Sequence, residues 1–234
     1  MNQKKAVFLF DYTGIMAKPW ADAGYLCYCF DGQHPLGVSK SVHENILNVG
    51  MWFSNLDSRS DVEAIKKIVG DGVCIVFGFP ECTDLTVAGA RHFKAKYNKD
   101  PAFQHKAMQL VYLTVLVGDA LCCKWGFENP VSIISTWYRK PDFKFNPCDY
   151  GFYLPLNDVN PIYPNIYPGN DAYNKKTCIW AGNGFKKPKF SRVEALYKDN
   201  PGWKKCGGKS LKTKNVRSAT PRGFAQAVFE SNKL

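Results

Sequence analysis

The chain has 234 residues, of which 45% are hydrophobic and 22% charged, and its formal net charge at pH 7 is +11. A chain of this length buries roughly 70–75% of its unfolded surface, which sets it apart from small domains that need disulfides to fold. Its longest apolar stretch, residues 110–123, contains Gly118 and Asp119 and is too short and polar to span a bilayer. These properties are typical of one α/β domain with a small appendage.

Strands that alternate with helices are expected over the first 135 residues. Short apolar runs bounded by turn residues are typical of buried parallel strands, and they lie at residues 6–10, 25–30 and 73–77. Further strands are expected at residues 49–56 and within residues 127–134. A short helix is expected between 14 and 24, and a longer one over 101–123. Another helix should begin at the capping-box pattern Ser60-Asp61-Val62-Glu63 and end at Gly70. Strands that each return through a helix predict a mostly parallel sheet flanked by helices.

The character of the sequence changes after residue 137. Seven prolines between residues 138 and 188 exclude long helices there. Tyrosines and other aromatic residues crowd the same stretch, and linkers lack aromatics, so we expect an ordered, loop-rich region. A final helix is expected over residues 221–229, where apolar residues gather on one side.

Nearly all of the excess positive charge lies in residues 185–222, which contain twelve Lys or Arg and two acidic residues. A polyanion is the natural partner of such a segment. A solvated basic surface is the alternative, but the glycines and aromatic residues between the charges favour nucleic acid.

A candidate cofactor site follows the first expected strands. Asp11-Tyr12-Thr13-Gly14 comes directly after the first strand, where a turn lets backbone N–H groups approach a cofactor. Asp31 ends the second strand about twenty residues later, where a carboxylate can accept hydrogen bonds from ribose hydroxyls. Asp57 follows the third expected strand and is a further candidate. The pattern leaves a dinucleotide or S-adenosylmethionine open, and the missing G-x-G-x-x-G argues against the dinucleotide.

A nucleophile and an acid follow two other strands. Gly78-Phe79-Pro80-Glu81-Cys82 closes one apolar run, and Glu128-Asn129-Pro130 closes another. A lone cysteine is more often a packed thiol, and a lone glutamate a surface group. Their shared placement at strand ends favours a thiol nucleophile beside an acid. Cys148, Cys178 and Cys206 lack the short C-x-x-C spacing of a zinc site, so no metal is expected.

These motifs together resemble those of the DNA cytosine-C5 methyltransferase family, and most closely the small methyltransferase-like proteins of bacteriophages. Phe10-Asp11-Tyr12-Thr13-Gly14, followed by Ala23-Gly24-Tyr25, is similar to the family's first cofactor motif, and Asp31 to its acidic ribose contact. Three more matches follow in chain order: residues 78–82 resemble the G-x-P-P-C nucleophile motif, residues 128–130 the E-N-V motif, and Ser218-Ala219-Thr220-Pro221 the C-terminal motif.

The resemblance implies a Rossmann-like S-adenosylmethionine-dependent methyltransferase fold and C5 methylation of cytosine in DNA. Cys82 would attack C6 of a flipped-out base, Glu128 would interact with N3, and Arg139 stands as a candidate for the arginine of the Q-x-R-x-R strand. S-adenosylmethionine would be bound by Phe10, Tyr12, Thr13, Gly14, Asp31, Asp57, Pro80, Ser218 and Ala219. Residues 1–137 and 208–234 would form the catalytic core, and residues 138–207 a reduced substrate-recognition region.

Some positions depart from the family pattern. Glu81 stands where a second proline is usual, and a carboxylate beside the thiol predicts a raised pKa for Cys82. Ile15-Met16-Ala17 stand where further glycines are usual. Two alternatives follow: the same chemistry on RNA or a pyrimidine nucleotide, or a catalytically silent nucleic-acid-binding protein with this fold. A separate protein that supplies target recognition is a further candidate partner.

The cysteines and the N-terminal residues predict the compartment. Several of the nine cysteines lie inside apolar runs, where reduced thiols act as small hydrophobic groups. Lys4-Lys5 leads into an apolar run of five residues, which is shorter than the core of a signal peptide. We therefore expect a cytoplasmic protein with no membrane partner, in a bacterial host cell if the chain is phage-encoded.

Overall fold

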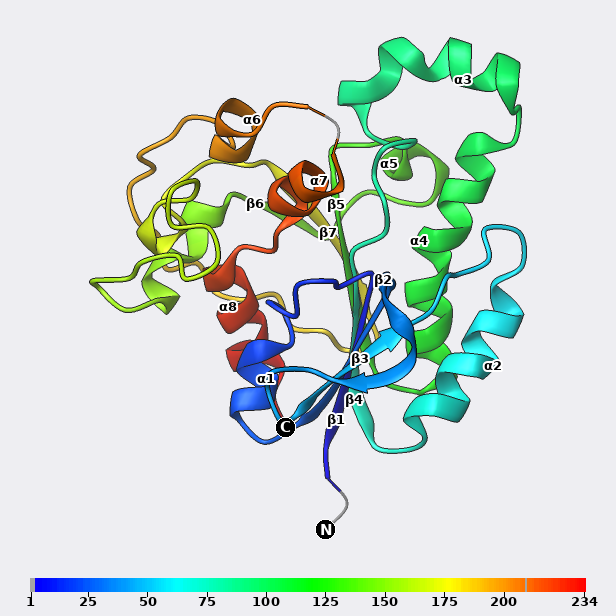
Figure 1. The fold of residues 1–234 in the computed structure, drawn as a ribbon, viewed down its shortest axis with the longest axis horizontal. Coiled ribbons are helices and arrows are strands. Elements are labelled where there is room, and N and C mark those ends of the chain that lie inside the picture. The colour runs from blue at the N-terminus through cyan, green and yellow to red at the C-terminus, as the bar shows by residue number, and fades with distance from the viewer. Residues whose placement is uncertain (1–2, 209) are drawn as a thin grey trace.

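A seven-stranded sheet forms the centre of the computed structural model, which describes residues 3–208 and 210–234 (Figure 1). The strand order is β3-β2-β1-β4-β5-β7-β6. The strands are β1 (Lys5–Leu9), β2 (Leu26–Lys40), β3 (Ile46–Gly50), β4 (Val73–Gly78), β5 (Lys124–Pro130), β6 (Phe143–Phe145) and β7 (Thr177–Gly182). Adjacent strands from β2 through β1 and β4 to β5 are parallel, whereas β7 is antiparallel to β5 and to β6. The predicted α/β fold, a mostly parallel sheet flanked by helices, is confirmed.

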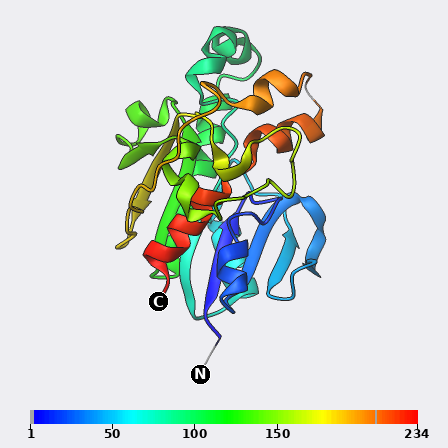
Figure 2. The same ribbon diagram turned by 90° about the vertical axis from the view of Figure 1, so that its left-hand side faces the viewer.

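Helices cover both faces of the sheet. Helices α2 (Ser58–Val69) and α4 (Phe103–Ala120) lie on one face, and α1 (Lys18–Asp22) and α8 (Arg222–Asn232) lie on the other (Figures 1 and 2). Side chains of a strand point alternately to the two faces. In β4, Val76 therefore packs in the hydrophobic cluster under α4, while Ile75 and Phe77 pack in the cluster that contains Phe224 of α8. This continuous burial explains why β4 is apolar throughout.

The second strand is longer than the sequence pattern predicts, because it turns back on itself. Its first half pairs with β3 in parallel, from Cys27 opposite Ile46 to Asp31 opposite Gly50. In its second half, Val38 lies opposite Val49 and Lys40 lies opposite Leu47, so the residue numbers of the two strands run in opposite directions. Residues 47–50 of β3 thus each pair with both halves of β2. The second half therefore lies along the outer edge of β3.

The third strand lies earlier in the chain than predicted, at Ile46–Gly50 and not at residues 49–56. It ends at Gly50, where a Cβ atom would lie 1.9 Å from the backbone oxygen of Pro35, so the chain of β2 crosses close by at this point. Asp57 consequently does not lie at the end of a strand, so the prediction that placed it there is wrong. It is the N-cap of α2, and its side chain accepts a hydrogen bond of 3.0 Å from the backbone N–H of Arg59. The helix begins at Ser58, two residues before the predicted capping box, and it ends before Gly70 as predicted.

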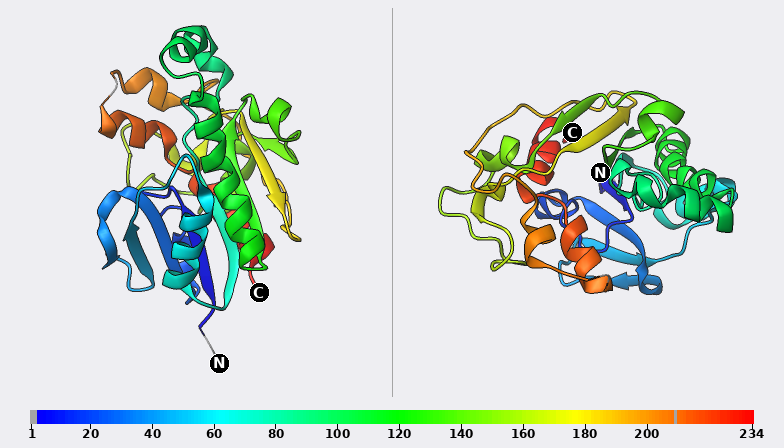
Figure 3. Two further views of the ribbon diagram at one scale, coloured as in Figure 1. Left: turned by 90° about the vertical axis from the view of Figure 1, so that its right-hand side faces the viewer. Right: turned by 90° about the horizontal axis from the view of Figure 1, so that it is seen from above.

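The remaining helices lie near the carboxyl ends of the parallel strands, at the top of Figure 1. They are α3 (Phe93–Lys99), α5 (Ile134–Trp137), α6 (Pro201–Lys205) and α7 (Leu211–Ser218). Figure 3 (left) shows α3 beyond the end of α4. Among the described residues, none of the helices combines the length and the apolar character that a bilayer crossing requires.

The proline- and aromatic-rich segment packs against α8. Between residues 138 and 200 its helical structure consists of two short 3₁₀ segments, Pro147–Tyr153 and Gly169–Asp171, as its prolines predict. Asp171 accepts a hydrogen bond of 2.8 Å from the backbone N–H of Gly223, and Asp158 forms an ion pair with Arg222. The segment also supplies β6 and β7 to the sheet, which its composition does not predict. The division of the chain into residues 1–137 with 208–234 and residues 138–207 stays a prediction.

Candidate active site

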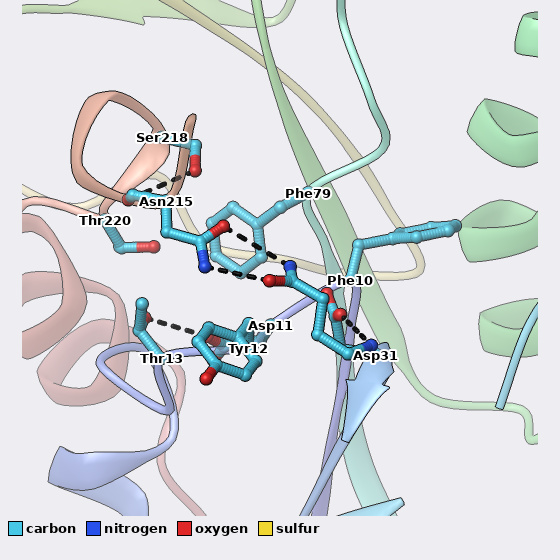
Figure 4. Close-up of a pocket in the computed structure, with 10 residues that line it drawn as sticks. Phe10, Asp11, Tyr12, Thr13, Asp31, Phe79, Asn215, Ser218 and Thr220 are labelled. Carbon is cyan, nitrogen blue, oxygen red and sulfur yellow. Dashed lines mark hydrogen bonds between the residues drawn. The ribbon is translucent and has the colours of Figure 1, made fainter. Parts of the chain in front are cut away.

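A cavity of about 80 Å³ lies at the carboxyl end of β1 (Figure 4). In an open α/β sheet, ligands bind where the strand order changes direction, and here β1 has β2 on one side and β4 on the other. The lining residues come from the ends of β1, β2 and β4 and from α7 and the loop after it. They are Phe10, Asp11, Tyr12, Thr13, Asp31, Gln33, Phe79, Asn215, Ser218 and Thr220.

A constrained turn shapes the wall formed by the residues after β1. Phe10 has a φ angle of 60°, a left-handed conformation that is rare for a bulky side chain, and its ring packs 5.0 Å from that of Phe53. Oδ1 of Asp11 then accepts hydrogen bonds from the backbone N–H of Gly14 (2.9 Å) and the hydroxyl of Thr13 (3.2 Å). Such strained, hydrogen-bonded turns persist where the surrounding structure fixes them, and they cluster at functional sites.

The charged groups that line the cavity are carboxylates. Asp11 is 3% exposed, and its Oδ2 atom has no hydrogen-bond partner among the described residues. Burial raises the pKa of Asp11 to about 6, and the nearby charge of Asp31 adds to this effect. Burial also raises the pKa of Asp31, whose Oδ1 accepts a hydrogen bond of 2.8 Å from the backbone N–H of Gln33.

This lining suits S-adenosylmethionine. The cofactor carries positive charge and ribose hydroxyl groups, which carboxylates can bind. The rings of Phe10, Tyr12 and Phe79 supply apolar surface, and in the described part of the chain no Lys, Arg or His lines the cavity. The unpartnered Oδ2 of Asp11 is a further acceptor for a donor that a ligand supplies.

A pair of amides closes the cavity between β2 and α7. Nδ2 of Asn215 donates to Oε1 of Gln33 at 2.8 Å, and Nε2 of Gln33 donates to Oδ1 of Asn215 at 3.3 Å. A second, more open cavity of about 390 Å³ shares Tyr12 and Thr13 with the first. Ligand pockets are typically about 300–1,000 Å³, so a whole cofactor needs more room than the first cavity offers.

Cys82 follows the carboxyl end of β4, and Glu128 lies near the carboxyl end of the adjacent strand β5. Strands β4 and β5 are parallel, and their register places Gly78 opposite Phe127. The segment after β4 is joined to β5 by a buried hydrogen bond of 3.1 Å from Nδ2 of Asn129 to the backbone oxygen of Pro80. Because Phe79 lines the cavity, the segment from residue 79 to 82 leads directly from the cavity to the thiol of Cys82.

The carboxyl of Glu128 affects the ionisation of the Cys82 thiol. Burial, and after it the charge of Glu128, raises the pKa of Cys82 to about 11, and Glu81 adds to this effect as the sequence predicts. Burial raises the pKa of Glu128, because its Oε1 atom is fully buried without a hydrogen-bond partner in the described structure, although the residue as a whole is partly exposed. The positive charge of Lys175 lowers both pKa values, so Cys82, Glu128 and Lys175 belong to one electrostatic cluster.

The structure brings most of the predicted cofactor residues together. Phe10, Tyr12, Thr13, Asp31 and Ser218 line the first cavity, and Gly14 lines the second. Pro80 follows the lining residue Phe79 and is held by Asn129. Ala219 is buried between two lining residues. Asp57 does not join them, since it is exposed and caps α2.

Arg139 also lies apart from the group. One guanidinium nitrogen donates to the backbone oxygen of Ala181 in β7 at 2.7 Å, and another forms an ion pair of 2.8 Å with Asp142. The guanidinium also lies 6.0 Å from the ring centre of Trp125, at the start of β5. Arg139 therefore stabilises the carboxyl end of β7, and its contacts do not include Cys82 or Glu128.

Sequence patterns did not identify several residues of the site. Phe79, Thr220 and Asp11 lie inside the recognised motifs, which is the signal that could have found them. Gln33 lies two residues after Asp31, within reach of the same cavity. Asn215 and Lys175 stand in no recognised motif, since only the tertiary fold brings α7 and the segment before β7 to this edge of the sheet.

Part of the basic segment is neutralised within the molecule. Arg192, Lys204 and Arg222 form ion pairs with acidic residues. Other lysines of the segment are exposed: Lys186, Lys187, Lys189, Lys198, Lys205, Lys212 and Lys214. Lys209 lies outside the described residues. Helices α6 and α7, to which Lys204, Lys205, Lys212 and Lys214 belong, lie near the carboxyl ends of the parallel strands (Figure 1).

No family model matches the sequence, and no curated protein matches it. Among solved structures, the chain is similar to a protein described as a DNA modification methyltransferase encoded within a prophage of E. coli, with 15% sequence identity and a TM-score of 0.47. The match covers 82% of this chain and 53% of that chain, so this chain spans about half the length of the solved structure.

Proposed function

We propose that the protein transfers a methyl group from S-adenosylmethionine to C5 of cytosine in DNA. One observation carries the proposal: a thiol and an acid, Cys82 and Glu128, converge at the ends of adjacent parallel strands. The segment that contains the thiol begins at a cavity whose lining suits the cofactor.

The roles of the two residues follow from cytosine chemistry. C5 of cytosine is a poor nucleophile, and attack of the Cys82 thiolate on C6 breaks the conjugation of the ring and places negative charge at C5. A protonated Glu128 would donate a hydrogen bond to N3 and stabilise the charge that develops. Its raised pKa supports this role, because burial favours the protonated carboxyl. Bound S-adenosylmethionine supplies the methyl group that C5 takes up, after which loss of the C5 proton expels the thiol.

The proposal also assigns residues to the cofactor and to the DNA, from the placement of their side chains. Asp31 would accept hydrogen bonds from the ribose hydroxyls, and Phe10, Tyr12, Thr13 and Ser218 would surround the rest of the cofactor. The target base cannot be reached inside a duplex, so it would be flipped out at a cost of a few kcal/mol. Exposed lysines of the basic segment would neutralise DNA phosphates, which makes affinity fall steeply with salt concentration.

A catalytically silent DNA-binding protein is the second candidate function. The observation that favours it is the pKa of Cys82, which burial, Glu128 and Glu81 raise to about 11. At pH 8 such a thiol is ionised to the order of 0.1%, whereas nucleophilic cysteines usually have lowered pKa values. Catalysis therefore requires substrate binding to shift this pKa, for example by protonation of Glu128.

A covalent trap tests the proposal. DNA containing 5-fluorocytosine holds the thiol adduct, because fluorine at C5 cannot leave as a proton does. We expect an adduct that survives denaturing electrophoresis with the wild-type chain and with Cys122→Ser, which changes an exposed cysteine away from the pair, but not with Cys82→Ser. RNA and nucleotides that contain the same base test the other substrates. Salt-sensitive DNA binding without any adduct, across varied sequences, would instead support the silent protein.

A further inference from the structure

The loop of residues 151–170 exposes large apolar side chains to solvent. Leu156 is 83% exposed, and Val159, Phe152 and Ile162 are 68%, 55% and 45% exposed. In Figure 1 this loop, drawn in yellow-green, projects from the left side of the molecule, whereas α2 and α4 lie on the right. Single exposed apolar residues are normal, but several gathered in one loop mark an interaction surface.

Hydrogen bonds within the loop hold this surface in place. Nδ2 of Asn170 donates to the backbone oxygens of Gly151 (3.1 Å) and Pro155 (2.9 Å), which ties the two ends of the loop together. The backbone N–H of Asn170 donates to Oδ2 of Asp158 at 2.7 Å, and Asp158 forms an ion pair with Arg222 of α8. A loop that is already ordered loses little conformational entropy when it binds a partner.

Two backbone positions show that the sequence builds this order. Asn170 has a φ angle of 51°, a left-handed conformation that asparagine tolerates better than most residues. At Gly169 a Cβ atom would lie 2.0 Å from the backbone oxygen of Asp158, so a larger residue does not fit where the chain passes itself. The shape of the loop is therefore fixed before any partner binds.

The charge of this region differs from that of the rest of the chain. Residues 145–174 contain no Lys, Arg, His or Glu, although the chain has 31 Lys or Arg. Each of the three aspartates there, Asp149, Asp158 and Asp171, forms an ion pair or accepts a backbone hydrogen bond within the molecule. Lys205 of α6 reaches the loop, where it donates to the backbone oxygen of Asn165.

This distribution of charge excludes two classes of partner. Phosphates of DNA and the anionic surface of a membrane are bound through clusters of Lys and Arg, which the loop does not contain. An uncharged apolar surface on another protein matches the loop instead.

We propose that the partner is a second copy of this chain, with the two loops packed against each other across a two-fold axis. Each copy carries a net charge of +11, so two copies repel each other where their basic surfaces meet. The loop lets them approach through a surface of low charge. A two-fold axis places the same patch on both sides, so apolar side chains meet apolar side chains. This inference does not depend on the function proposed above.

Sedimentation velocity of the full chain, freed of nucleic acid by nuclease, tests the proposal over about a hundredfold range of protein concentration. The test variant is Leu156→Glu, which places a charge at the centre of the patch. The matched control is Leu36→Glu, because Leu36 is 85% exposed but lies in β2, outside the loop. Thermal unfolding shows whether both variants are folded.

We expect the wild-type chain and Leu36→Glu to sediment as dimers and Leu156→Glu as a monomer. The substitution is present in both copies, and loss of one buried leucine is worth about tenfold, so the dissociation constant of the dimer should rise about a hundredfold. A wild-type monomer at every concentration would overturn the proposal. A dimer that survives Leu156→Glu, or that Leu36→Glu weakens equally, would overturn it as well.

The dependence on salt gives a second readout. Added NaCl screens the repulsion between two molecules of charge +11, so the dimer should become tighter as the salt concentration rises. An association that weakens with salt would rest on ion pairs or on bound nucleic acid, and it would contradict an apolar interface.

Discussion

Replacement of Glu128 by glutamine should make the thiol of Cys82 more reactive in the free protein. Burial is the largest cause of the raised pKa of Cys82 and the charge of Glu128 is the second, and together with the smaller causes they raise it from 9.0 to about 11. This shift corresponds to about 3 kcal/mol against the thiolate. Glutamine removes the charge and keeps the shape, but it leaves the burial in place. We therefore expect the thiolate fraction at pH 8 to rise by about two- to tenfold.

Alkylation by iodoacetamide, resolved by peptide mass spectrometry, measures this fraction, because the thiolate is the reacting species. The chain has nine cysteines, so the rate must be followed on the peptide that contains Cys82, with the exposed Cys122 as internal reference. The rate should be recorded between pH 7 and 10 for the wild-type chain and for Glu128→Gln.

Two further variants rank the causes. Glu81→Gln should accelerate alkylation less than Glu128→Gln, because Glu81 has the smaller effect on Cys82, and Lys175→Gln should slow it, because Lys175 lowers the pKa. An unchanged rate in Glu128→Gln would show that the carboxyl does not lie beside the thiol. The convergence on which the proposed function rests would then be refuted.

The remaining predictions concern the closing amides, the capping residue and the buried carboxyls. Asn215→Ala removes both hydrogen bonds to Gln33, so stopped-flow fluorescence should show faster binding and faster release of the cofactor. Unchanged rates would mean that the Gln33–Asn215 pair does not restrict entry of the cofactor into the cavity. Asp57→Ala removes the N-cap of α2 and should lower the free energy of unfolding by about 1 kcal/mol in urea, while the affinity for S-adenosylmethionine stays as in the wild type. Burial raises the folded-state pKa of Asp171 from 3.8 to about 6, so the stability that this group contributes is greatest below pH 4 and declines as the pH rises to 6. Asp171→Asn should remove about 3 kcal/mol of this decline from the free energy of unfolding measured in urea. A profile of stability against pH that is as steep in the variant as in the wild type would contradict the shift.

The strands that were predicted correctly are those whose side chains are buried on both faces. β1 and β4 are apolar throughout because helices cover both sides of the sheet, and their sequence alone indicates them. The second half of β2 contains Pro35 and is mostly exposed, so it has no apolar pattern and was not predicted. β7 was missed for another reason, since it lies in a segment whose prolines and aromatic residues indicate loops.

The same distinction holds for the candidate site. Cys82 follows β4, Glu128 lies near the end of β5, and Asp31 ends the half of β2 that pairs in parallel with β3. The order of elements along the chain is therefore enough to place them at one edge of the sheet. Gln33 and Asn215 are 182 residues apart, and they meet only because α7 returns to the end of β2. Arg139 was assigned from a family pattern without a local motif. Its contacts with Ala181 and Asp142 depend on β7, which the sequence did not reveal.

The return of β2 along β3 has a consequence for association with other proteins. Open strand edges invite pairing with a further chain. On this side the hydrogen-bonding groups of β3 already have neighbours in the same chain, and Gly50 allows the close crossing that this requires. On the opposite side the outermost strand, β6, has three residues. A protein that supplies target recognition would therefore find only short backbone edges to extend, namely residues 36–40 of β2 on one side and β6 on the other, and it would bind through side chains of the helices and loops.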